Sequence, residues 1–228
     1  MQITSDYFYN WATIRRFSLE AGIPSWVFIQ SVAYWGDLQA RRRPKEVEIL
    51  WQVNVSLAYG AKGIQYFTYW TPEVASDAWR HFGEALVSAD WQPTPLYDYA
   101  KRVNQYLKVV GKVLLPLTTE AVVHAGEKPL PRGAKAFKAD GGHVKSTRCS
   151  PVILSRFRKP TGGTERYLFV ANRSFINKTE TRLTLYDSVS EVLELDSQTG
   201  TFARVTQQGT LLVRLTPGGA RLYLLRSI

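Results

Sequence analysis

The first half of the chain alternates between segments with a helical spacing of apolar residues and short, nearly continuous apolar runs. Residues 6–21 have the pattern of a helix that ends at Gly22. Residues 24–32 (PSWVFIQSV) form an apolar run of strand length, which is typical of a parallel strand buried on both faces. Residues 44–59 carry apolar side chains at i, i+3 and i+4, which predicts a helix with Pro44 in its first turn.

The same alternation continues towards residue 111. Residues 63–70 (GIQYFTYW) repeat the strand pattern. We expect a short helix at residues 76–82 and a longer one at residues 94–111, with Thr94 as N-cap and Pro95 at the first helical position. Strands that alternate with helices in this order are typical of βα units.

Beyond residue 113 the helical period disappears, and short alternating segments separated by turn residues replace it. Turns are expected at residues 161–164 (TGGT), 198–200 (QTG) and 217–219 (PGG). A series of short strands at this spacing is the signature of an antiparallel β-sandwich. The expected strands are residues 120–125, 134–139, 151–158, 166–172, 181–187, 190–195, 202–206, 210–215 and 220–226.

These patterns predict two domains and an α/β plus all-β fold class, with an α/β region at residues 1–112 and an antiparallel β-sandwich at residues 113–228. No stretch reaches the ~18 to 20 consecutive apolar residues that span a membrane, so we expect no membrane partner. The N-terminus lacks the layout of a signal peptide. We therefore expect either a cytoplasmic protein or a secreted one whose leader precedes this sequence.

The composition argues against metal and cofactor chemistry. The single Cys149 excludes an internal disulfide and any multi-cysteine metal site, and the three histidines (His81, His124 and His143) have no ligand spacing. We expect neither a metal nor a cofactor.

The formal charge of +10 is concentrated in the second half of the chain. Residues 1–112 carry 12 Lys/Arg and 10 Asp/Glu, whereas residues 113–228 carry 17 and 9. No recognition motif accompanies this charge, so we expect no nucleic-acid partner. The arginines alternate with apolar residues, as on the solvent face of a sheet: Arg156, Arg158, Arg166, Arg173 and Arg182. Binding of an anionic polysaccharide or nucleic acid through residues 113–228 stays open, and it would depend on salt.

Three neighbouring segments carry a resemblance to a known family. Residues 23–30 read IPSWVFIQ, the end of the next helix reads LAYGAKG (57–63), and residues 63–70 read GIQYFTYW. This series resembles the last two strands of the β-galactosidase-type glycoside hydrolases of clan A. Residues 94–104 look like their post-barrel helix, and residues 217–223 (PGGARLY) are similar to their C-terminal β-sandwich.

The resemblance implies the last two βα units of a (β/α)8 barrel, followed by an accessory β-sandwich. A whole barrel takes about 250 residues, so this would be only part of one. The implied function is that of a carbohydrate-active protein: the C-terminal part of a glycoside hydrolase that acts on hexose-containing glycans.

The catalytic residues of such an enzyme stay unassigned in this sequence. Glycoside cleavage needs two carboxyl groups, about 5 to 5.5 Å apart in retaining enzymes. In the resembled family the acid/base follows strand four, which is not in this chain, and the nucleophile ends strand seven, where this chain has Ile29 or Gln30. The nearest carboxylates, Asp37 and Glu73, are best interpreted as solvated loop residues.

Aromatic and amide side chains at the ends of the two expected strands favour sugar binding, since a flat ring presents an apolar face to the C–H face of a sugar. The resemblance implies that Trp70 is the platform beneath the sugar. Tyr69, Trp35 and Gln30 are the other candidate substrate-binding residues. An alternative for Gln30 is that its amide merely satisfies backbone groups at a strand end.

A rival hypothesis is a stand-alone carbohydrate-binding or structural module without enzymatic activity. Under the barrel hypothesis, two parallel strands have open edges and an uncovered apolar face, which predicts poor solubility or a tight homo-oligomer. A monodisperse monomer with a cooperative melt would favour the module.

Overall fold

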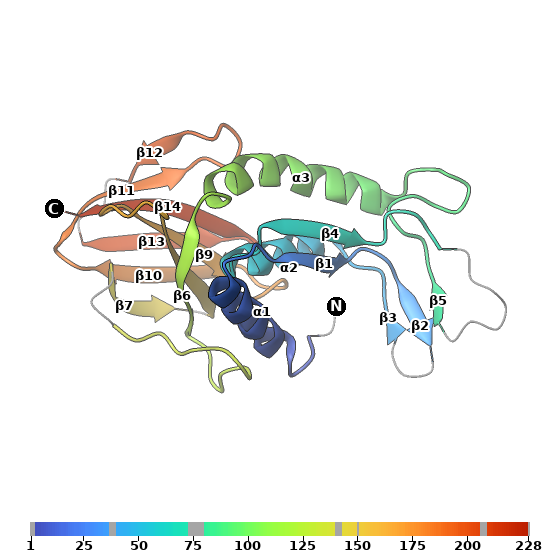
Figure 1. The fold of residues 1–228 in the computed structure, drawn as a ribbon, viewed down its shortest axis with the longest axis horizontal. Coiled ribbons are helices and arrows are strands. Elements are labelled where there is room, and N and C mark those ends of the chain that lie inside the picture. Colours follow the sequence, from blue (N-terminus) through green and yellow to red (C-terminus); the bar gives the residue numbers. More distant parts are fainter. Residues whose placement is uncertain are drawn as a thin grey trace.

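The computed structural model describes residues 3–36, 40–72, 80–139, 143–149, 151–205 and 209–227. Helices and a small parallel sheet occupy one part of the molecule, and a β-sandwich occupies the other (Figure 1). The fold is therefore of the α/β plus β-sandwich class. None of the helices in the described residues is long and apolar enough to span a membrane.

The first half forms the expected strand–helix–strand unit. Strands β1 and β4 pair in parallel, with Trp26 opposite Gly63, and the chain passes between them through α2. The left-handed Gly22 (φ 66°) ends the first helix, as expected. The elements are α1 (Tyr7–Ala21), β1 (Trp26–Gln30), α2 (Glu46–Ala58), β4 (Gly63–Phe67) and α3 (Pro95–Leu114).

Two helix ends differ from the expectation. Pro44 lies outside α2, because Lys45 is the N-cap and the Glu48 carboxylate accepts a hydrogen bond from the Lys45 backbone N–H (2.7 Å). Helix α3 begins as expected, but it continues past Gly111 because Leu114 still buries its side chain against the core. Burial of an apolar side chain therefore outweighs the weak helix preference of glycine.

A small antiparallel sheet, in the order β3-β2-β5, was not expected from the sequence. Its strands are β2 (Tyr34–Gly36), β3 (Ala40–Arg41) and β5 (Arg80–Phe82). The helix expected at residues 76–82 is wrong at Phe82, which pairs with Tyr34 across the sheet (ring centroids 6.4 Å apart). Residues 76–79 lie outside the described residues.

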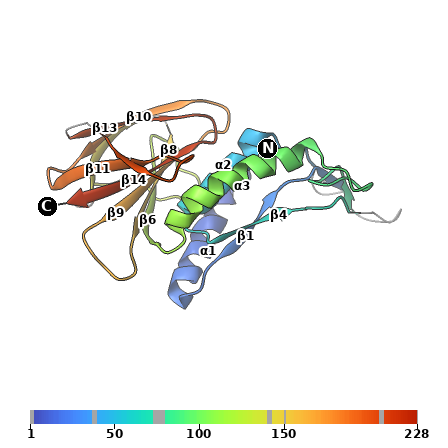
Figure 2. The same cartoon turned by 90° about the horizontal axis from the view of Figure 1, so that it is seen from above.

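The parallel sheet is buried on one face only. Val27 and Ile29 of β1 are buried against the helices, whereas Trp26 and Phe28 on the opposite face are 64% and 67% exposed. Figure 2 shows α2 and α3 along one side of β1 and β4. The expectation of a strand buried on both faces is therefore wrong, because no described element covers the second face.

The second half forms the expected β-sandwich. A six-stranded sheet in the order β12-β11-β14-β9-β8-β6 faces a three-stranded sheet in the order β13-β10-β7. Residues 134–139 do not form the expected strand, and only Ala136 bridges to His124. Strand β7 was not expected. The bounds are β6 (Thr118–Ala125), β7 (Val144–Cys149), β8 (Val152–Arg158), β9 (Arg166–Asn172), β10 (Thr179–Leu185), β11 (Val189–Leu195), β12 (Phe202–Arg204), β13 (Thr210–Leu215) and β14 (Ala220–Ser227).

The six-stranded sheet lies between two apolar cores. Phe169 and Leu222 point into the core shared with the helices, whereas their neighbours Val170 and Tyr223 point into the core shared with the three-stranded sheet. Successive side chains of a strand point to opposite faces. Covering both faces therefore explains why β9 and β14 are apolar at consecutive positions.

Helix α2 joins the two halves through buried polar contacts. Trp51 is fully buried, and its Nε1 donates to the Arg173 carbonyl (3.1 Å). Asn54 donates from Nδ2 to the carbonyl of Gly218 (2.8 Å), in the turn expected at residues 217–219. A Cβ at Gly218 would lie 2.5 Å from the Val47 carbonyl oxygen, so only glycine allows the turn to approach the helix this closely.

The arginines of the sandwich are largely paired. Arg173 is 17% exposed and pairs with Glu127 (3.1 Å), so the expected solvent-facing position is wrong for it, whereas Arg182 is exposed. One carboxylate, Glu120, receives three guanidinium groups from β8 and β9: Arg156 (3.0 Å), Arg158 (3.6 Å) and Arg166 (3.0 Å).

Candidate functional site

The four residues that the sequence singled out all lie near the carboxyl ends of β1 and β4. Gln30 is the last residue of β1, Trp35 lies in β2, and Tyr69 and Trp70 follow β4. In Figure 1 both strands point away from the sandwich and towards the small sheet formed by β2, β3 and β5. Ligands of open α/β sheets bind at this end of the strands.

Gln30 is held by hydrogen bonds to neighbouring backbone groups. Its side-chain Nε2 donates to the carbonyls of Val32 (2.9 Å) and Arg42 (2.8 Å). Its backbone N–H donates to Gln52 Oε1 (2.8 Å), and Gln52 Nε2 donates to the Gln30 carbonyl (3.2 Å). Both side-chain amide hydrogens of Gln30 are thus engaged, which favours a structural role and leaves Oε1 as the atom a ligand could contact.

The Gln52 amide forms the hydrogen bonds to Gln30 that a neighbouring strand would otherwise form. Ser31 donates its backbone N–H to the Phe67 carbonyl of β4 (2.8 Å), so the backbone groups of Gln30, one residue earlier, face away from β4. Gln52 is 5% exposed and lies on α2. Its amide satisfies the last donor and acceptor on this edge of β1.

A row of aromatic rings runs from the exposed face of the parallel sheet to the small sheet. Phe28 and Phe67 lie 6.2 Å apart edge to face, and Phe67 lies 6.1 Å from Phe82. Phe82 continues the row to Tyr34. The ring contacts hold the small sheet close to the ends of β1 and β4.

Trp35 is 49% exposed and stacks on His81 across the small sheet (6.2 Å between ring centroids, 22° between planes). Cross-strand ring pairs of this kind stabilise an antiparallel ladder. One face of the Trp35 indole therefore packs on His81 within the small sheet, and the exposed part of the ring can contact a ligand.

Trp70 forms a pair with a second tryptophan that the sequence analysis missed. Its ring stacks on Trp91 at 5.3 Å with 26° between the planes. Trp91 is 71% exposed and has a positive φ of 63°. Trp70 is half-buried, with an indole Nε1 that is buried and lacks a partner in the described residues. Trp91 is therefore the more exposed ring of the pair.

Tyr69 lies beside α3, apart from the tryptophan pair. It is 60% exposed and lines a cavity of about 380 Å³ together with Tyr66, Tyr97 and polar residues of α3. Tyr66 donates to Asn104 Oδ1 (2.8 Å), and burial raises the pKa of Tyr66 to about 12. The structure thus places Tyr69 and Trp70 in different surroundings, although they are adjacent in sequence.

The carboxylates described near this end of the strands are held in their charged form. Burial raises the pKa of Glu48, but hydrogen bonds from the Arg42 guanidinium and the Lys45 N–H outweigh this and lower it to about 2. The Ser88 hydroxyl lowers the pKa of Asp90. Neither carboxyl group holds a proton near neutral pH, as the acid of a glycosidase must.

The remaining acidic candidates do not complete a catalytic pair. Glu84 is exposed and lies 3.7 Å from Arg43. Asp37 and Glu73 lie outside the described residues. Across residues 3–36, 40–72 and the other described ranges, no group of three or more His, Cys, Asp or Glu side chains could hold a metal ion.

Comparison with known proteins gives a distant structural likeness. No family model and no curated protein matches the chain. A solved structure of a GH30 endoxylanase from Clostridium papyrosolvens is similar at 10% sequence identity and a TM-score of 0.39. The match covers all of this chain and 47% of the endoxylanase, so the chain spans about half the length of that protein. The likeness is a distant one of fold, and it does not identify a ligand.

Proposed function

We propose that this chain is a carbohydrate-binding part of a carbohydrate-active protein, and that it binds a hexose-containing glycan at the carboxyl ends of β1 and β4. One observation carries the proposal: exposed aromatic side chains belong to segments that follow the carboxyl ends of the two parallel strands, with Trp35 after β1, Tyr69 after β4, and Trp91 stacked on Trp70 after β4. Exposed indole and phenol rings stack on the C–H faces of sugars and lose little side-chain entropy on binding.

The roles of the residues follow from their surroundings. Trp91 is the sugar platform, and Trp70 supports it from beneath through the 5.3 Å stack. Trp35 adds a second exposed ring from the small sheet. Tyr69 contributes a hydroxyl on the α3 side, and Gln30 contributes only Oε1, since both of its amide hydrogens are engaged.

We also propose that β1, α2, β4 and α3 are the last two βα units of a (β/α)8 barrel. Three features support this: the parallel pairing of β1 and β4, the helices on one face, and the uncovered aromatic face opposite. In a barrel that second face would point inward and be covered by the remaining strands. Binding is proposed for this chain rather than hydrolysis, because its described carboxylates do not supply an acid and a nucleophile.

The second candidate, a basic surface that binds an anionic polymer, has less support. Four of the five arginines that suggested it form ion pairs, three of them with Glu120 and one with Glu127. These carboxylates offset part of the positive charge that a phosphate or sulfate would meet.

The proposal is tested by calorimetric titration with soluble β-linked gluco-, galacto- and manno-oligosaccharides. Trp91→Ala is expected to weaken binding of the preferred oligosaccharide about tenfold, since truncation removes the apolar ring surface that the sugar would cover. Trp26→Ala is the matched control, because Trp26 is exposed to a similar degree but lies at the amino end of β1. Equal binding by wild type and Trp91→Ala would contradict the proposed platform.

A further inference from the structure

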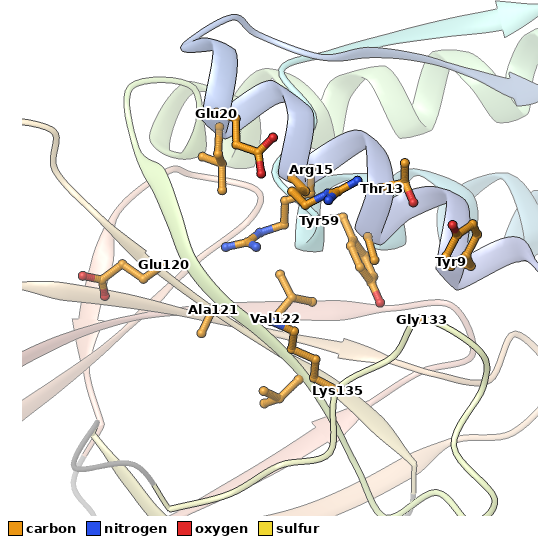
Figure 3. Close-up of a pocket in the computed structure, with 14 residues that line it drawn as sticks. Tyr9, Thr13, Arg15, Glu20, Tyr59, Glu120, Ala121, Val122, Gly133 and Lys135 are labelled. Atoms are coloured by element: carbon orange, nitrogen blue, oxygen red, sulfur yellow. The ribbon is translucent and has the colours of Figure 1, made fainter.

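A second cavity lies between the first helix and the sandwich, and none of its lining residues is at the carboxyl ends of β1 and β4. It has a volume of about 750 Å³. Helix α1 forms one wall, β6 forms the opposite wall, the loop after β6 closes one end, and Tyr59 from the end of α2 reaches in from the side (Figure 3).

Specific contacts fix the walls of this cavity. Gly133, in the loop after β6, packs against the backbone of α1 so closely that a Cβ there would lie 2.4 Å from the Tyr9 Cα. Arg132 pairs with Asp6 at the start of the same helix (2.7 Å). The Lys135 carbonyl accepts the backbone N–H of His124 in β6 (2.7 Å). The cavity is therefore already formed in the folded chain.

The charges that line the cavity are unbalanced. Arg15, Arg16 and Lys135 line it, and no ion pair with another described residue engages any of the three. Of the two lining carboxylates, Glu120 is bound by arginines of β8 and β9, and Figure 3 shows its side chain directed away from the others. Glu20 is the other, at the end of α1. The cavity thus carries an excess of positive charge.

Arg15 is the strongest sign of a missing counter-ion. One of its terminal nitrogens donates to the Thr119 carbonyl (3.0 Å), whereas its Nε is buried and has no hydrogen-bond partner in the described part of the chain. Burial lowers the pKa of Arg15, which reflects the cost of removing its charge from water. A partly buried guanidinium without a carboxylate partner is stabilised by an oxyanion, whose planar geometry its terminal nitrogens match.

The remaining walls are apolar. Ala12 and Leu19 line the cavity from α1, and Val122 lines it from β6. Contact with these apolar walls would remove the carbon atoms of a ligand from water, which favours binding. Together with Arg15, they select a molecule with one charged end and one hydrophobic end.

We propose that this cavity binds a small organic carboxylate, with the carboxylate on Arg15 and Lys135 and the apolar body between Leu19 and Val122. The inference is independent of the glycan site, because none of these residues lies at the ends of β1 and β4. It would make the junction of α1 and the sandwich a ligand site as well as a packing contact.

The test uses benzoate as probe, benzyl alcohol as its neutral counterpart, and the full chain. Isothermal titration is expected to show saturable benzoate binding that is at least tenfold tighter than benzyl alcohol binding. Arg15→Gln should weaken benzoate binding about tenfold or more, because a charge-assisted hydrogen bond is lost. Arg182→Gln is the control: it removes an equal charge from an exposed position of β10 and should leave the affinity for benzoate unchanged.

Two further variants test benzoate binding in this cavity if Arg15→Gln does not fold. Lys135 is exposed, so Lys135→Gln preserves the fold and should weaken benzoate several-fold. Glu20→Gln removes a lining carboxylate and should tighten benzoate several-fold. Absence of saturable benzoate binding, equal binding of benzyl alcohol, or no response to these two variants would overturn the proposal.

Discussion

Gly133 holds the loop after β6 against α1. Its φ of 83° is in the left-handed region, and a Cβ would lie 2.4 Å from the Tyr9 Cα and 2.7 Å from the Tyr9 nitrogen. Backbone atoms of a helix cannot move aside as the end of a flexible side chain can. At the residue scale, this position combines a conformational requirement with a steric one.

Gly133→Ala is therefore expected to destabilise the chain by roughly 3 kcal/mol or more, as the sum of a left-handed conformation and overpacking. Gly162→Ala is the control: Gly162 has a similar φ of 87° but open space around it, so it should cost only about 1 to 2 kcal/mol. Urea unfolding measures both. Equal losses would mean that the contact with Tyr9 contributes nothing.

The side chain of Gln52, on α2, forms hydrogen bonds with two backbone groups of Gln30 in β1. Gln52→Leu removes the amide that satisfies the backbone N–H and carbonyl of Gln30. We expect a loss of roughly 2 kcal/mol, because two partly buried backbone groups lose their partners. Gln65→Leu, at an exposed position of β4, is the control. Hydrogen exchange at the Gln30 amide should accelerate in Gln52→Leu, and unchanged exchange would refute this role.

At the scale of elements, the start of α2 is stabilised by one carboxylate. Glu48 is 1% exposed, accepts from the Lys45 N–H, and is bound by Arg42. Its position at the first turn also suits the partial positive charge of a helix N-terminus. The folded-state pKa of about 2 lies below the value of about 4.3 expected in the unfolded chain.

A depressed folded pKa gives a defined pH dependence. The contribution of Glu48 is fully present above about pH 4.3 and is lost as pH falls towards 2. Glu48→Gln should therefore be less stable than wild type at pH 6, with a difference that shrinks below pH 4 in urea unfolding curves. Glu46→Gln, in an exposed pair with Arg102, should have a smaller effect. A pH-independent difference for Glu48→Gln would contradict the account.

The elements differ in how far their sequence determines them. Helices α1 and α3 could be predicted because a local apolar pattern and local stop or cap residues coincide. Strands β2, β3 and β5 could not, because each has only two or three residues, and β2 and β5 pair across more than 40 positions of the chain. Which faces of β1 are buried likewise depends on the elements that pack against the strand, and the local sequence pattern does not specify these.

The candidate site was predictable to a similar degree. The positions of Tyr69 and Trp70 after β4 follow from strand order, because the carboxyl ends of parallel strands share one edge. The stack of Trp91 on Trp70 joins residues 21 positions apart, and the partners of Gln30 lie up to 22 positions away. Contacts of this kind arise from tertiary packing and leave no local signal.

At the scale of the whole molecule, the parallel sheet is the least protected element. Both β1 and β4 are edge strands in the described structure, and Trp26 and Phe28 project from the uncovered face. Open edges beside exposed apolar side chains favour association. We therefore expect the chain alone to self-associate.

The double variant Trp26→Ser/Phe28→Ser should shift the chain towards monomer in sedimentation velocity. Phe17→Ser, which removes an exposed aromatic side chain from α1 instead, should leave the distribution unchanged. A wild-type chain that sediments as a monodisperse monomer and melts cooperatively would contradict the expected self-association and favour a stand-alone module.

The central claim is glycan binding at the ends of β1 and β4, and calorimetric titration of the wild-type chain with the oligosaccharide panel tests it most directly. We predict saturable binding of at least one hexose oligosaccharide, weakened about tenfold by Trp91→Ala and unchanged by Trp26→Ala. Absence of heat with every oligosaccharide, or equal weakening by both variants, would contradict the claim.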